Sequence, residues 1–72
     1  MIKQKIHNAL KLKYQAEILE AYTNLMNYFE NKVAVAEHPN IIESMDKLVE
    51  ELGTAEDKLK TLQENFDELI RH

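Results

Sequence analysis

The stretch AEHPNIIE, residues 36 to 43, decides the fold that this sequence predicts. It contains the chain's single proline, Pro39, which disfavours helical geometry at the residue before it. Asn40 follows as a candidate N-cap, and Glu43 stands at the spacing that completes a capping box. We therefore expect one helix to end before Pro39 and a second to begin after Asn40.

The segments on both sides of this turn have the composition of long helices. The chain has one glycine, one proline and no tryptophan, and it is rich in leucine, alanine, glutamate and lysine. We predict helices over about residues 3–36 and 41–71, each near 50 Å long at about 1.5 Å per residue. Two equal arms joined by a tight turn form an antiparallel helical hairpin, so the predicted fold is all-α with a single domain over residues 1–72.

The single glycine, Gly53, leaves two interpretations open. Apolar residues recur through this region at heptad spacing without a skip, which favours a continuous second helix. However, Gly53 is followed by Thr54 and Asp57, a pattern that also resembles a helix stop and a new N-cap. The alternatives are a tolerated weak point in one helix and a local kink.

Heptad spacing also predicts the faces by which the two helices pack, as in a coiled coil. The second helix carries its seam at Met45, Leu48, Leu52, Ala55, Leu59, Leu62, Phe66 and Leu69. The first helix is expected to meet it with Ala9, Leu12, Ala16, Leu19, Met26 and Val33, helped by Tyr22 and Phe29. Folding at residues 38 to 40 would then set Ala16 opposite Leu62 and Tyr22 opposite Ala55.

The first helix has apolar residues on its other face as well. A helix that is apolar nearly all round is expected inside a larger assembly, and one partner helix covers only one face. We therefore predict a homo-oligomer, with a dimer favoured, in which two hairpins form a four-helix bundle. The predicted oligomer interface comprises Leu10, Tyr14, Ile18, Ala21, Leu25, Tyr28 and Val35.

The charges are unevenly distributed along the chain, which has a net charge of −4. Residues 1–13 contain four lysines and no acidic residue, and these are candidate contacts for an anionic ligand: Lys3, Lys5, Lys11 and Lys13. We expect them chiefly to balance the acidic end of the second helix. A nucleic-acid contact or a membrane-surface contact is the less favoured alternative, since the acidic remainder of the chain repels nucleic acid.

The polar residues do not form a pattern typical of an enzyme, so no catalytic residue is predicted. The sequence has no glycine-rich phosphate loop and no cysteine, and its one arginine stands at the end of the chain. The three histidines, at positions 7, 38 and 72, are far apart in sequence, and the Glu-x-x-His pairs of di-iron bundles are missing. We expect no metal site and no cofactor.

These patterns predict a small, non-enzymatic structural or adaptor protein that oligomerises and acts through contacts with an unidentified protein partner. In size and composition the chain resembles the accessory helical proteins of bacteria and their phages, although no family motif matches. The alternative is a small nucleic-acid-associated regulator that uses the basic N-terminal segment, and a third hypothesis is a metal-binding or ligand-binding bundle. Without a long apolar run, the chain is expected to avoid the membrane and to be cytoplasmic.

Overall fold

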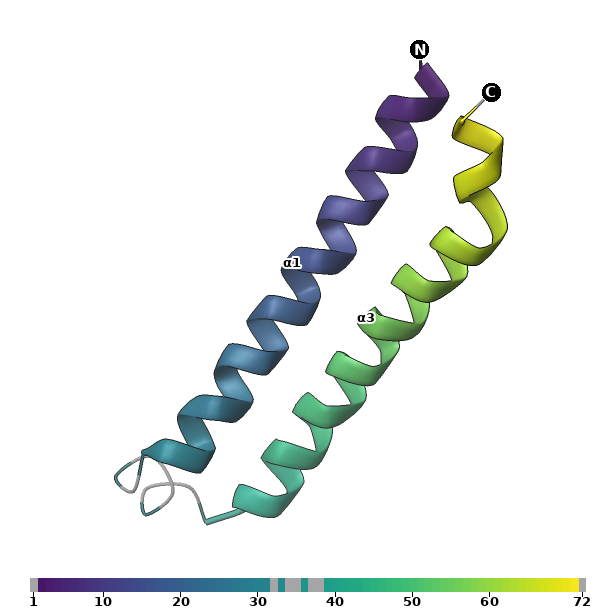
Figure 1. Cartoon of the computed structure of the whole chain (residues 1–72). Helices are drawn as coiled ribbons and strands as arrows, with labels where there is room; N and C mark the ends of the chain where they lie inside the picture. The colour runs from purple at the N-terminus through teal and green to yellow at the C-terminus, as the bar shows by residue number, and fades with distance from the viewer. Residues whose placement is uncertain (1, 32, 34–35, 37–38, 72) are drawn as a thin grey trace.

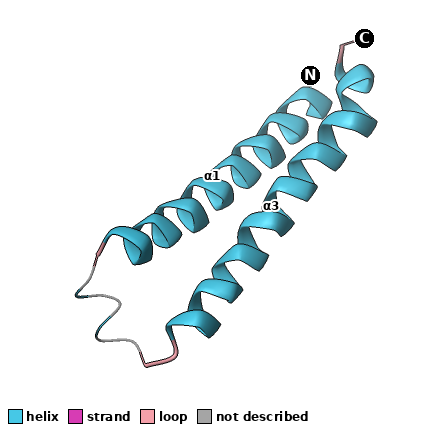
Figure 2. Ribbon diagram, turned by 60° about the horizontal axis from the view of Figure 1, so that its bottom comes forward, coloured by secondary structure: helices cyan, strands magenta, loops and turns pink. Residues whose placement is uncertain are grey.

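The computed structural model of the chain shows two long helices that lie side by side and run in opposite directions (Figure 1). Helix α1 spans Ile2–Glu30 and helix α3 spans Ile41–Ile70. The structure describes residues 2–31, 33, 36 and 39–71, and no strand occurs among them. The molecule measures 52 × 16 × 14 Å, and Figure 2 shows the two helices as neighbours along their whole length. The predicted all-α antiparallel hairpin is confirmed.

Helix α1 stops at Glu30 and does not run unbroken to residue 36 as predicted. The cause is local, because the side-chain oxygen of Asn31 accepts a hydrogen bond of 3.0 Å from the backbone N–H of Val33. Such side-chain-to-backbone bonds compete with the helical pattern. Val33 and Ala36 are helical again, but residues 34, 35, 37 and 38 lie outside the described residues.

Helix α3 begins where the sequence predicts, but its N-cap lacks the predicted hydrogen bond. Asn40 is the N-cap residue, and its carbonyl accepts the first helical bond from the N–H of Ser44 at 3.0 Å. Its backbone angles are φ −110° and ψ 49°, and its side chain makes no capping bond. This ψ is far from the extended geometry in which a capping side chain faces the first turn.

Gly53 lies within the uninterrupted helix α3, so the continuous interpretation is confirmed and a helix stop at this residue is wrong. No glycine or other described residue has a positive φ angle. A Cβ atom built on Gly53 meets no atom within 4 Å beyond its immediate helical surroundings. The backbone at this position therefore does not require glycine.

The core of the hairpin is narrow and lies between one face of each helix. Its buried apolar side chains are Ala21, Leu25, Ala55 and Leu62. On α3 the predicted seam is largely confirmed, since the positions from Met45 to Leu62 are buried or half-buried. Phe66 and Leu69 at its end are exposed.

On α1 the predicted packing face is wrong, because the opposite face of the helix meets α3. Leu12, Leu19 and Phe29 of the predicted seam are 56%, 66% and 72% exposed. The alternative face offers an apolar series from Leu10 to Tyr28, whereas the predicted seam places Thr23 and Glu30 at the contact. The predicted residue pairs, such as Ala16 with Leu62, are therefore also wrong, because they assume that face of α1.

Replacing Gly53 with alanine is expected to stabilise the protein by about 0.5 to 1 kcal/mol. Alanine has the higher helix propensity, it restricts the unfolded chain, and its methyl group enters open space. Thermal unfolding monitored by circular dichroism will test this as a rise in Tm. The control is Gly53→Pro, which should destabilise the helix by about 3 kcal/mol or more; a lower Tm for Gly53→Ala contradicts the continuous helix.

Candidate association surface

The structure places the residues predicted as the oligomer interface on the face of α1 that packs against α3. We call this face the inner face of α1. Ala21 and Leu25 are buried, and the other described members are half-buried: Leu10, Tyr14, Ile18 and Tyr28. Val35 lies outside the described residues. In a single hairpin α3 already covers this set, and its role between copies stays a prediction.

A second apolar face of α1 remains exposed. Its members recur at spacings of three and four residues, which places them along one side of the helix. We call them the outer stripe: Ala9, Leu12, Ala16, Leu19, Tyr22, Met26 and Phe29. All are exposed except the half-buried Met26, and Tyr22 is 53% exposed. These residues extend over most of the length of α1.

The small core of the hairpin makes this exposure energetically important. Ala21 and Ala55, the two most buried apolar residues, retain 3% of their surface, and both are small. None of the described residues is fully buried, since each keeps at least 2% of its surface exposed. A chain of this length buries only about 60% of its unfolded surface even when it is compact. The apolar surface left outside the hairpin is therefore large compared with the surface inside it.

Helix α3 presents a different outer face. Its exposed acidic residues include Asp46, Glu50, Asp57, Glu64 and Glu68. The exposed apolar side chains of α3 are Ile42 and Val49 near its start and Phe66 and Leu69 near its end. Its middle is therefore mainly a charged, solvated surface, as the sequence predicts.

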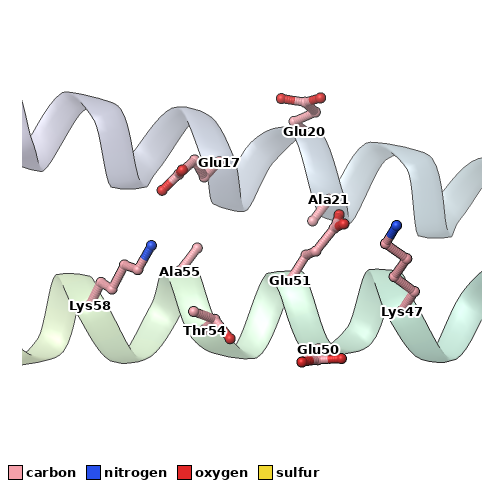
Figure 3. A pocket seen from close by; sticks show the side chains of 9 residues that line it. All are labelled: Glu17, Glu20, Ala21, Lys47, Glu50, Glu51, Thr54, Ala55 and Lys58. Atoms are coloured by element: carbon pink, nitrogen blue, oxygen red, sulfur yellow. The ribbon is translucent and has the colours of Figure 1, made fainter.

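A shallow polar groove runs between the helices along one side of the hairpin (Figure 3). The methyl groups of Ala21 and Ala55 point into the space between the helices, while Glu20 and Glu50 point away from it. The groove is lined by Glu17, Glu20, Ala21, Lys47, Glu50, Glu51, Thr54, Ala55 and Lys58. This lining contains carboxylates, ammonium groups and one hydroxyl, but no histidine or cysteine. Acidic and basic side chains therefore alternate around the two alanine methyl groups.

The far end of the hairpin is joined by two polar contacts between α1 and α3. His7, which is 8% exposed, lies with Nε2 at 2.9 Å from Oδ1 of Asp67. The side-chain amide of Gln4 donates to the carbonyl of Ile70 at 3.3 Å. Further along, the Lys58 ammonium lies 5.8 Å from the centre of the Tyr14 ring, within cation–π range. These contacts link α1 to α3 across the hairpin.

The four candidate lysines lie on the N-terminal part of α1, beside the end of α3. Lys3, Lys5 and Lys13 are exposed and Lys11 is half-buried. Nζ of Lys13 lies 3.6 Å from Oε2 of Glu17 within the same helix. The antiparallel arrangement places the basic segment next to the acidic end of α3, while the ion pair of Lys13 lies within α1 itself.

Neither a metal site nor a membrane span is found among the described residues. No cluster of three or more His, Asp or Glu side chains there is placed to hold a metal ion. Within the same residues, neither helix is long and apolar enough to cross a membrane.

No family model, curated protein or solved structure matches this chain.

The sequence interpretation recognised that α1 has two apolar faces but assigned the wrong one to the contact with α3. In the sequence the two faces are alike, because Glu17 and Asn24 lie among the apolar residues of the inner face, and Thr23 and Glu30 stand at seam positions of the other face. What separates the two faces is a contact formed in the folded chain, where Nε2 of His7 lies 2.9 Å from Oδ1 of Asp67 when the inner face meets α3.

Replacing Asp67 with alanine is expected to destabilise the protein by about 1 to 3 kcal/mol, because it removes the hydrogen-bond partner of the buried His7 imidazole. Urea denaturation at a fixed protein concentration will measure the loss. Glu64→Ala is the matched control, since its pair with Lys60, at 3.8 Å, is exposed and worth about 0 to 1 kcal/mol. Equal losses for both variants would show that the His7 contact does not contribute.

Converting Lys11 and Lys13 to glutamine is expected to cost at most about 1 kcal/mol for each exposed pair that is lost. A gel-shift assay at low salt provides the functional measurement. We expect neither the wild type nor the double variant to retard DNA or RNA. Retardation by the wild type alone, with a steep dependence on salt, would support the nucleic-acid alternative.

Proposed function

We propose that this chain is a small, non-enzymatic structural or adaptor protein that self-associates and acts through protein–protein contacts. The outer stripe of α1 is the surface by which one hairpin binds a second copy, giving a four-helix bundle. The observation that carries the proposal is the exposure of the outer stripe on a hairpin whose own core is small, with Leu19 66% exposed and Phe29 72% exposed.

The hydrophobic effect provides the driving force. Burying one large apolar side chain stabilises an assembly by about 1.5 to 3 kcal/mol relative to leaving it in water. Each copy contributes Leu12, Leu19, Tyr22 and Phe29, which are all more than half exposed. Contiguous apolar surface of this kind on a small protein marks an interaction site.

A second copy is the partner that best fits the stability of the chain. A hairpin with so small a core needs its outer surface covered whenever it is folded, and small domains commonly meet this need by oligomerisation. A copy of the same chain is always present where the chain is made. A closed two-fold dimer covers the stripe on both copies at once.

The outer face of α3 supports the adaptor part of the proposal. In a dimer formed through α1, the acidic residues of α3 remain on the outside, where they are available to a partner with a basic surface.

Replacing Leu19 with aspartate is the direct test. The wild type is expected to sediment as a dimer at tens of micromolar, with a Tm that rises with protein concentration. Leu19→Asp should shift the population to monomer and lower the Tm, because it places a charge in the buried interface. Thr61→Asp, on the exposed face of α3, is the control and should leave the dimer intact.

Leu25→Asp distinguishes the outer stripe from the inner face. Leu25 is 7% exposed within the hairpin, so its replacement should unfold the chain whether or not a dimer forms. Leu19→Asp, in contrast, should retain more helical signal than Leu25→Asp at the same concentration. A folded wild-type monomer at tens of micromolar, with a Tm independent of concentration, would overturn the proposal.

A further inference from the structure

We infer that the second copy lies antiparallel on the outer stripe, with Leu19 at the two-fold axis. This inference rests on the proposed function and adds the orientation and register of the partner. The layers it places together are Leu19 with Leu19 of the second copy, Ala16 with Tyr22, Leu12 with Met26, and Ala9 with Phe29.

The order of small and large residues along the outer stripe favours the antiparallel orientation. Within the outer stripe, the two alanines, Ala9 and Ala16, lie on the N-terminal side of Leu19, and the two aromatic residues, Tyr22 and Phe29, lie on its C-terminal side. A parallel dimer would set each residue against itself, leaving a gap at the alanines and crowding at the rings. The antiparallel dimer sets each alanine against a ring, as dense packing requires.

The charges of α1 favour the same orientation. From residue 2 to residue 13 the helix carries four lysines and no acidic residue, and from residue 14 to its end it carries Glu17, Glu20 and Glu30 with no basic residue. A parallel dimer would bring the two basic segments together. An antiparallel dimer centred on Leu19 keeps the two basic segments apart and sets Glu30 of one copy opposite residue 8 of the other, between Lys5 and Lys11, although Glu20 lies near its own counterpart beside the axis. The antiparallel arrangement also opposes the two helix dipoles.

The length of α1 selects the register. With Leu19 at the axis, every layer falls between Ala9 and Phe29, inside the helix Ile2–Glu30. A register shifted by one heptad toward the loop would pair Leu19 with Met26 and Leu12 with Val33, which lies beyond the end of α1. It would also leave Ala9 without an aromatic partner. The register centred on Leu19 uses the whole stripe.

Single cysteines test this arrangement cleanly because the chain has no cysteine. Leu19→Cys treated with a short bis-maleimide is expected to give a covalent dimer as the main species. Leu12→Cys alone should not, since its two copies lie 14 residues apart in register, about 21 Å along the helix. Mixing Leu12→Cys with Met26→Cys, after unfolding and refolding together, should give a covalent heterodimer. Asp57→Cys, exposed on α3, gives the background level.

The possible outcomes distinguish a wrong orientation or register from a failure of self-association itself. Coupling of both Leu19→Cys and Leu12→Cys with themselves would show a parallel dimer and overturn the inference. If Leu19→Cys couples with Met26→Cys and does not couple with a second Leu19→Cys chain, the register is the shifted one and the inference is overturned as well. Both results leave the self-association intact. A wild type that sediments as a folded monomer overturns the proposed function, and the inference with it.

Discussion

Two helices packed against each other can bury only one face of each, and this geometric constraint governs the whole molecule. Helix α3 has one apolar face and a mainly charged outer face, so packing against α1 is enough to cover most of its apolar residues. Helix α1 has apolar residues on two faces, and α3 covers just one of them. The hairpin therefore leaves an apolar stripe in water, and the proposed function depends on a second copy covering that stripe.

The choice between the two faces of α1 depends on side-chain size and on polar groups at the end of the hairpin. Ala21 and Ala55 are buried at the middle, where small side chains let two helices approach closely. At the far end, His7 and Gln4 find partners on α3 in Asp67 and the carbonyl of Ile70. A buried imidazole without a partner would be destabilising, so these contacts favour the inner face over an otherwise similar apolar face.

The two helices thereby take different roles in the proposed function. Helix α1 is apolar on both sides and becomes the centre of the assembly, where it contacts α3 of its own chain and α1 of a second copy. Helix α3 shields one side of α1 and keeps its acidic side chains outside for a further partner. In the proposed dimer, the alanines toward one end of the outer stripe and the aromatic residues toward the other end give the association its direction.

The sequence by itself determined the elements of this protein. Pro39 and Asn40 place the turn, the heptad series from Met45 to Leu62 places the packing face of α3, and that same unbroken series predicts a continuous helix through Gly53. These features are local, since each depends on backbone geometry or on the periodicity of one helix.

The tertiary structure alone decided which face of α1 lies inside and in what register the helices meet. It also revealed that Asn31 ends α1 early through its own side chain. A residue count along one helix cannot rank two apolar faces of similar length. The ranking depends on contacts with residues about 60 positions away, such as His7 with Asp67, and these exist only once the chain has folded back on itself.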